Sequence, residues 1–168
     1  MHRAHPGDWA TVRDVRLAAL ADAPDAFAST LAGEAGQPEA QWRARIADLP
    51  WFLGFRDGQP AGLIAALPPR YGPGQDPNWH LVSMWVSPDA RGAGLADLLV
   101  GAVTEHARQA GADRVTLWVT VGNGRARAFY RRMGFAPTGR RQMYPRRDAA
   151  DLDEEEFVRV LSDLEHGP

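Results

Sequence analysis

The chain of 168 residues contains no cysteine and no lysine, and it has no long apolar run. Without cysteine, disulfides, thiolate metal ligands and a cysteine nucleophile are excluded. All 19 basic residues are arginines, so the lysine that a P-loop requires after its last glycine is missing. The longest apolar stretches, such as residues 61–69, are too short to cross a bilayer. We therefore expect no membrane partner.

The composition that remains is typical of one globular domain over residues 1–168, with 45% hydrophobic and 24% charged residues. The net charge of −2 provides no basic field for a nucleic acid. The five histidines are scattered without metal-ligand spacing, so no metal site is expected. Residues 1–9 lack the apolar region of a secretory signal, which favours a cytoplasmic location.

Apolar periodicity and turn residues predict alternating strands and helices. Strands are expected at residues 1–4, 79–86, 114–121, 137–145 and 154–161, with a hairpin over 51–67 that turns at Asp57-Gly58. Helices are expected from Asp8 to Pro24, from Pro38 to about Asp48, and over 94–110 and 125–133, leaving 25–37 and 68–78 as loops. The strand over 79–86 is apolar at nearly every position, which predicts burial on both faces. The strand, helix, strand order at 79–121 predicts a parallel pair within a mixed α/β sheet.

The stretch Arg91-Gly-Ala-Gly-Leu-Ala96 lies at the junction of this buried strand and the next helix. A helix begins with unpaired N–H groups and a positive dipole end, and small residues there leave room for a phosphate on the amides. A plain tight turn explains the same residues. A dinucleotide-binding fingerprint fits poorly, because Asp97 occupies the position of its third glycine or alanine.

A second motif follows one helix and one strand later, in the segment Asn123-Gly-Arg-Ala-Arg-Ala-Phe-Tyr-Arg-Arg-Met-Gly-Phe135. The first stretch resembles the Arg/Gln-x-x-Gly-x-Gly/Ala loop of the GNAT N-acetyltransferase superfamily. The second is similar to that family's Asn-x-x-Ala-x-x-Phe-Tyr-x-x-x-Gly-Phe. The resemblance is strong over residues 80–145. It implies a single α/β domain whose mixed, mostly antiparallel sheet has about seven strands, a splayed parallel pair and about four flanking helices.

The resemblance also implies acetyl-coenzyme A as the co-substrate. Its pyrophosphate would lie on the amides of the glycine turn, and its pantetheine arm would lie between the splayed strands. The residues expected to bind it are Met84, Trp85, Val86, Arg91, Gly92, Ala93, Gly94, Leu95, Ala96, Asp97, Asn123, Arg125, Phe129 and Tyr130. No metal is implied.

The reaction implied is direct acyl transfer, through a ternary complex, from the thioester to a primary amine of a small molecule or a peptide. Tyr130 matches the family position that protonates the leaving thiolate. Several family members carry a glutamate as general base on the central strand or at the end of the next strand. This sequence departs from that pattern, because residues 81–86 and 117–121 contain no carboxylate. His80 can titrate near neutrality, while Ser83 and Thr120 are poor bases that can hold a water in a relay.

The acceptor site is expected to draw on Glu34, Tyr71 and Trp79, and Glu34 is a further candidate base. Homodimers are also compatible with the resemblance, since dimers are common in the superfamily. A non-catalytic acyl-coenzyme A-binding module is the alternative function, because the usual glutamate is missing. A third possible function, general nucleotide binding, is supported by the glycines alone.

Overall fold

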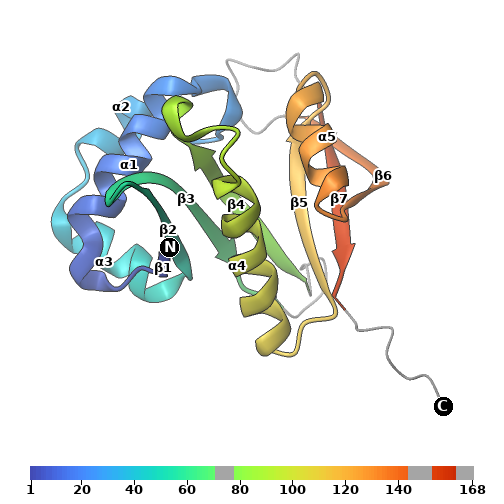
Figure 1. Cartoon of the computed structure of the whole chain (residues 1–168), viewed down its shortest axis with the longest axis horizontal. Helices are drawn as coiled ribbons and strands as arrows, with labels where there is room; N and C mark the ends of the chain where they lie inside the picture. The colour runs from blue at the N-terminus through green and yellow to red at the C-terminus, as the bar shows by residue number, and fades with distance from the viewer. Residues whose placement is uncertain (71–77, 144–152, 162–168) are drawn as a thin grey trace.

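The computed structural model describes residues 1–70, 78–143 and 153–161 (Figure 1). Its strands are β1 (His2–Arg3), β2 (Trp51–Arg56), β3 (Gln59–Leu67), β4 (Trp79–Val86), β5 (Arg114–Thr120), β6 (Ala136–Met143) and β7 (Asp153–Val160). Its α-helices are α1 (Trp9–Asp22), α2 (Leu31–Ala35), α3 (Glu39–Asp48), α4 (Leu95–Gln109) and α5 (Gly124–Arg132). No helix in the described ranges is both long and apolar enough to span a membrane.

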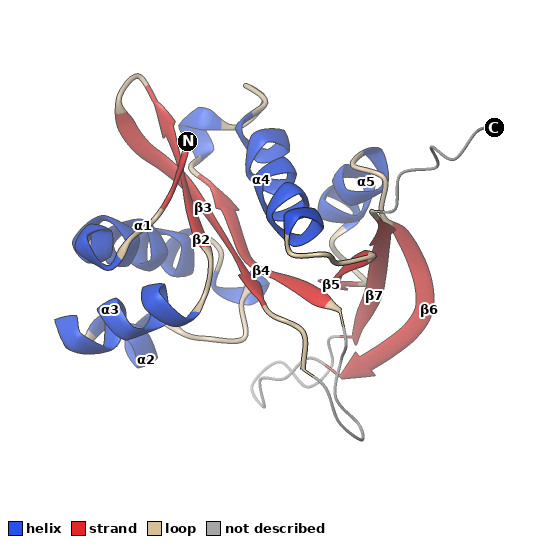
Figure 2. Cartoon of the chain, turned by 90° about the horizontal axis from the view of Figure 1, so that it is seen from below, coloured by secondary structure: helices blue, strands red, loops and turns tan. Residues whose placement is uncertain are grey.

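The seven strands form one sheet in the order β1-β2-β3-β4-β5-β7-β6. Among the described strands, β4 and β5 are the one parallel pair, and the other neighbours are antiparallel. Helices α1, α2 and α3 lie on one face of the sheet, and α4 and α5 lie on the other (Figure 2). The mixed sheet with one parallel pair confirms the predicted fold class.

Local sequence explains the elements that frame the centre of the sheet. Asp57 and Gly58 both have positive φ, 50° and 78°, which lets β2 and β3 join through a two-residue turn. Helix α4 buries an apolar stripe that includes Leu99, Val100 and Val103, and Gly111, at φ 77°, follows its last turn. A 3-10 turn at Pro88–Ala90 and the glycine turn connect the end of β4 to the start of α4.

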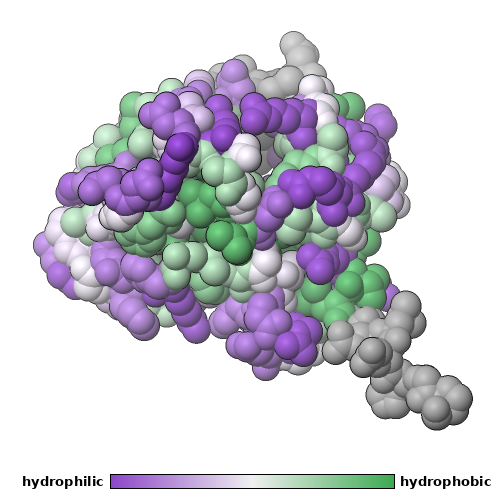
Figure 3. Space-filling model, viewed as in Figure 1, coloured by the Kyte–Doolittle hydropathy of each residue, from purple (hydrophilic) through white to green (hydrophobic). Residues whose placement is uncertain are grey.

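Each face of the sheet has its own apolar core. The core under α4 and α5 includes Leu99, Leu117 and Phe157, and the core under α1 and α3 includes Leu20 and Trp51. In the space-filling view, hydrophilic residues cover the outer parts of one side of the molecule, and apolar residues gather near its middle (Figure 3). Burial on both faces therefore holds the middle strands in place, and the ends of these strands remain available to form a site.

Two expectations about this part of the chain were wrong in detail. The predicted loop over 25–37 contains a 3-10 turn at Pro24–Ala26 and the short helix α2, whose first turn is capped by the Thr30 hydroxyl. With helix α2 the described residues contain five α-helices, close to the expected number of about four. Strand β4 is not buried along its whole length, because four of its eight residues are half-buried: His80, Val82, Ser83 and Met84.

A candidate acyl-carrier cleft between the splayed strands

Strands β4 and β5 pair only where they begin. Their described partners are Trp79 with Val115 and His80 with Thr116, although β4 continues to Val86 and β5 to Thr120. Four further residues of β5 correspond to about 13 Å of strand. The two strands therefore separate towards their carboxyl ends, as predicted for a splayed pair.

A β-bulge turns β4 at the same place. Ala65 on β3 pairs with Val82 and Leu63 pairs with Trp85, so Ser83 and Met84 together face one residue of β3. Ser83 has φ 58°, which is uncommon for a residue other than glycine. The bulge places Met84 in the wall of the cleft that opens between the strands.

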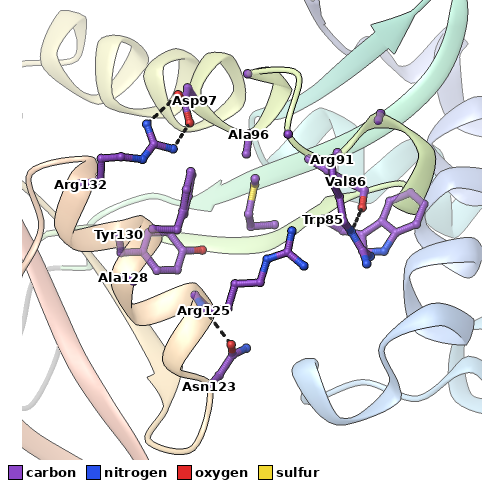
Figure 4. Close-up of a pocket in the computed structure, with 16 residues that line it drawn as sticks. Trp85, Val86, Arg91, Ala96, Asp97, Asn123, Arg125, Ala128, Tyr130 and Arg132 are labelled. Carbon is purple, nitrogen blue, oxygen red and sulfur yellow. Dashed lines mark hydrogen bonds and ion pairs between the residues drawn. The ribbon is translucent and has the colours of Figure 1, made fainter.

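This cleft has a volume of about 870 Å³ and is bounded by the end of β4, the start of α4 and one side of α5 (Figure 4). Twelve of the fourteen residues expected to bind the cofactor line it: Met84, Trp85, Val86, Arg91, Gly92, Gly94, Ala96, Asp97, Asn123, Arg125, Phe129 and Tyr130. Four more lining residues had not been expected to contact a cofactor: Ala90, Ala126, Ala128 and Arg132. The two motifs, about thirty residues apart in sequence, thus form opposite walls of one cleft.

The glycine turn needs its glycines for the backbone. Gly92 and Gly94 have φ of 81° and 80°, and a Cβ built on either would meet no atom within 4 Å. The left-handed conformation, rather than a clash within the chain, therefore requires glycine here. Gly94, the residue before α4, provides no side-chain cap. Its carbonyl accepts a hydrogen bond from the Leu98 N–H (3.2 Å), which begins the hydrogen bonding of the helix. The earlier N–H groups of α4 thus remain available to an anion at the cleft.

Arg91 is directed to the protein rather than to the cleft interior. Its Nε donates to the Val86 carbonyl (3.0 Å), and its guanidinium pairs with Asp22 on α1. The Trp85 indole N–H also donates to Asp22 (2.9 Å). This indole hydrogen bond and Arg91 hold the pKa of Asp22 below its ordinary value. Arg91 therefore ties the glycine turn to α1, a role that the sequence did not predict.

An ion pair joins the two walls of the cleft. Arg132 on α5 donates to both carboxylate oxygens of Asp97 on α4, at 2.7 and 2.9 Å (Figure 4). The Arg132 hydrogen bond lowers the pKa of the Asp97 carboxyl. The negative charge in the first turn of α4 is thus neutralised beside the candidate anion site.

Tyr130 lies in the α5 wall with only 8% of its surface exposed. Phe129 and Phe135 contact its ring edge-to-face, at centroid distances of 5.2 and 5.7 Å. Burial raises the pKa of the Tyr130 phenol, which keeps the phenol protonated at neutral pH. Its hydroxyl points into the cleft (Figure 4). The geometry suits a proton donor.

Two further polar residues of α5 lie at the cleft. The Asn123 side chain accepts from the Ala126 N–H (3.0 Å) and caps the helix. Its place in the lining is therefore fixed by the helix that it starts. Arg125 extends into the cleft from the first turn of α5 (Figure 4).

The structure does not bring His80 or Trp79 to the cleft. Both lie at the paired beginning of β4, away from the splayed end. His80 Nδ1 is 2.9 Å from the Thr116 hydroxyl, and Trp79 packs edge-on against His106 in the core. Trp79 is buried and His80 is half-buried at this end of the strand pair, and neither is among the described residues that line the cleft.

Glu34 is also a structural residue in its observed position. It is 3% exposed, and its carboxylate pairs with Arg16 (2.9 Å) and Arg45 (3.2 Å). Burial alone would raise the pKa of Glu34, but the two guanidinium groups lower it below its ordinary value. A carboxylate held in this way is a poor base.

The remaining expected site residues have other positions. Ser83 forms the bulge of β4 and is absent from the described lining of the cleft. Ala93 is exposed in the glycine turn, and Leu95 packs into the core under α4. Tyr71 lies outside the described residues.

Comparison with known proteins identifies the fold and the two motifs together. The profile of the acetyltransferase (GNAT) family matches residues 17–135. The chain belongs to the GNAT acetyltransferase family. This GNAT protein is 30% identical, over 105 residues, to an uncharacterised N-acetyltransferase of Methanocaldococcus jannaschii. The match covers 56% of the chain and 42% of that relative, so the chain spans less than half the length of the curated relative.

Solved structures share the GNAT fold over almost the whole chain. A GNAT-family acetyltransferase from Streptococcus pneumoniae has a TM-score of 0.79 at 18% identity, and the match covers 96% of this chain and 98% of that one. An acetyltransferase from Salmonella typhimurium, described with its cofactor acetyl-CoA, has a TM-score of 0.76 at 18% identity, covering 99% and 96% of the two chains. At these identities the likeness supports the fold alone.

Proposed function

We propose that this GNAT protein transfers an acyl group, most simply acetyl, from a coenzyme A thioester to a primary amine of a small molecule or peptide. The observation that carries the proposal is the cleft between the splayed strands. The open N-terminus of α4 lies on one wall, and the Tyr130 hydroxyl points in from the other. The proposal treats residues 1–168 as a single domain, and homodimer formation stays a prediction.

The lining fits the parts of coenzyme A in order. The first N–H groups of α4, beside Gly92 and Gly94, would hold the pyrophosphate, because a Cβ-free surface lets phosphate oxygens reach the backbone. The unpaired edge of β4 near Met84 and Val86 would hold the pantetheine amides as a neighbouring strand would. The acetyl-CoA named with the Salmonella structure supports the same choice of co-substrate.

The bound thioester supplies an activated acyl group, and the residues of the chain orient it and move protons. Tyr130 would give a proton to the sulfur as the C–S bond breaks. A backbone N–H at the bulge of β4 would stabilise negative charge on the carbonyl oxygen. Direct transfer follows from the lack of a cysteine nucleophile. Met84 lines the cleft, which favours a small acyl group.

A non-catalytic acyl-coenzyme A-binding module is the second candidate. It is favoured by one observation: β4 and β5 carry no aspartate or glutamate. This alternative predicts cofactor binding without turnover.

Calorimetry with coenzyme A and release of free thiol from acetyl-CoA with a panel of primary amines test the proposal together. Binding and amine-dependent thiol release are expected. Binding without turnover on any amine of the panel would favour the binding module. If coenzyme A does not bind at all, both candidates fall.

A further inference from the structure

Three successive glutamates on β7, Glu154, Glu155 and Glu156, differ in their partners. All three are buried. Glu155 pairs with Arg127 on α5 (2.6 Å), and Glu156 pairs with Arg140 on β6 (3.0 Å). Glu154 has no arginine or histidine partner among the described residues.

The partner of Glu154 is instead a neutral amide. Its carboxylate accepts one hydrogen bond from the Gln142 side chain (2.9 Å), and the glutamate is 9% exposed. Burial raises the pKa of Glu154, and the Gln142 hydrogen bond offsets only part of this. A buried carboxylate without a counter-ion is unfavourable when ionised, and it is stabilised when a cation arrives.

The register of the sheet places Glu154 at the open end of the splayed pair. Glu154 lies directly opposite Thr120, the last residue of β5, and directly opposite Gln142 on β6. Successive strand residues point to opposite faces, and Glu155 faces α5 through Arg127. Glu154 therefore points to the face opposite α5. It lies beside the last residue of β5, one strand away from the gap between β4 and β5, and it is not among the described residues that line the cleft.

We propose that Glu154 receives the protonated amine of the acceptor and takes its proton, which makes this face the acceptor side and a cationic amine the acceptor. This inference rests on the proposed acyl transfer. One ammonium proton passes to Glu154, and the neutral nitrogen then forms the C–N bond while the C–S bond breaks. The second nitrogen proton leaves to solvent, and the sulfur takes its proton from Tyr130, which is reprotonated from solvent. No oxidant or further reactant is needed.

The other acidic or titratable groups on this face are already engaged or lie far from Glu154. Glu156 accepts from the Thr138 hydroxyl (2.9 Å) as well as from Arg140. His80 lies beside Thr116, about 13 Å of strand from Thr120. Arg114, which pairs with Val160 at the other end of β5, is exposed and lies about 20 Å of strand from Thr120. Among the described residues of β5 and β7, Glu156 and Arg114 are the other ionisable groups on this face, so the protonation of Glu154 is the one that an approaching amine changes most.

Glu154→Gln tests the proposal, because it removes the charge and keeps the shape. We expect unchanged coenzyme A affinity and a fall of about a hundredfold in kcat/KM, the size of a lost general base. Wild-type kcat/KM should fall at acidic pH as Glu154 is protonated, and the variant should lack this fall. The denaturation midpoint of the variant at pH 7 should equal or exceed that of the wild type. The raised pKa of Glu154 means that its ionised carboxylate disfavours folding at that pH, and the substitution removes this charge.

The matched control is Glu156→Gln, an equally buried glutamate on the same strand and face, whose loss should leave kcat/KM near that of the wild type. A second readout needs no turnover. The measurement is the carbon NMR signal of the Glu154 carboxyl at pH 6 in the presence of coenzyme A. Added butylammonium should shift this signal towards that of the ionised carboxylate, and butanol should not.

The outcomes separate the two proposals. Wild-type turnover together with an unaffected Glu154→Gln variant overturns the role of Glu154 and leaves acyl transfer standing. An unmoved carboxyl signal with butylammonium overturns it as well. Failure of the wild type to bind coenzyme A overturns the proposed function itself.

Discussion

The two faces of the sheet at the open end of β4 and β5 are built from different kinds of sequence. The α4 and α5 side draws its lining from two continuous segments, residues 84–97 and 123–132, in which glycines and alanines that expose the backbone alternate with larger side chains such as Phe129 and Tyr130. The opposite face draws Thr120, Gln142 and Glu154 from three strands that lie far apart in the chain. A cleft that binds through the backbone is encoded locally, whereas a polar face made of side chains depends on which strands pair.

This comparison also separates the charges on the two faces. Asp97 on the cleft side is neutralised by Arg132, and Glu34 on the α1 side is neutralised by Arg16 and Arg45. Among the described residues, Glu154 has no arginine or histidine partner and accepts a hydrogen bond from Gln142. Charge that is paired holds the fold together, and charge that lacks a counter-ion is available to a ligand.

The largest effect is expected at Glu34. Glu34→Gln leaves Arg16 buried without a counter-charge, and breaking a buried pair in this way should lower the free energy of unfolding at pH 7 by about 3 kcal/mol. Glu39→Gln, which removes an exposed pair with Arg43, should change it little. Urea denaturation measures both. Lost turnover with unchanged stability in Glu34→Gln would instead place Glu34 at the acceptor.

The same variant has a pH signature. Because the folded pKa of Glu34 is lowered, its contribution to stability is present above the unfolded pKa of about 4.3 and is lost as pH falls through the folded pKa. The gap between wild type and Glu34→Gln should be constant from pH 7 to about pH 5 and should shrink below about pH 4.

The fold was largely predictable from the sequence, because its elements are marked locally. The Asp57-Gly58 turn appears as predicted, and the helices predicted over 94–110 and 125–133 correspond to α4 and α5. Helix α2 was missed, since its five residues carry no apolar periodicity and depend on the Thr30 cap and on the burial of Glu34.

Tyr130→Phe gives the next largest effect and tests the cleft side alone. Without the hydroxyl, the leaving sulfur loses its proton donor, so kcat should fall about a hundredfold. Coenzyme A affinity should stay the same, because the ring still packs against Phe129 and Phe135. Calorimetry and thiol-release kinetics on one preparation separate the two quantities. Unchanged kcat would move the donor role away from Tyr130.

Gly94→Val tests whether coenzyme A binds to backbone amides that the left-handed glycine turn presents. A β-branched residue is strained at φ 80°, and a strain of 1–2 kcal/mol corresponds to about a tenfold loss of coenzyme A affinity. Gly101→Ala, within α4 and also free of neighbours within 4 Å, is the control and should bind normally. Equal affinity in Gly94→Val would mean that the turn tolerates other conformations and does not present the amides.

Only the part of the site that the two sequence motifs form was predictable. The motifs identified twelve of the lining residues, because backbone binding leaves glycines and small residues at fixed spacing. Nothing local could reveal that Arg132 reaches Asp97, 35 residues away, or that Arg91 reaches Asp22, 69 residues away. His80 was placed at the site because it can titrate near neutrality, and Trp79 was expected in the acceptor site, but both lie at the paired end of β4. Glu154 was missed because its position opposite Thr120 exists only in the paired sheet.

The smallest effect is expected at the ion pair that joins the cleft walls. Asp97→Asn removes a negative charge from the first turn of α4 and releases Arg132 to an incoming anion, so coenzyme A should bind about two- to fivefold tighter at low salt. The gain should shrink as salt screens it. Asp57→Asn, in the β2–β3 turn, makes the same charge change away from the cleft and should leave affinity unaltered. Weaker binding in Asp97→Asn would show that the pair holds the walls at the spacing the ligand needs, and would make it part of the scaffold rather than a competitor for the anion.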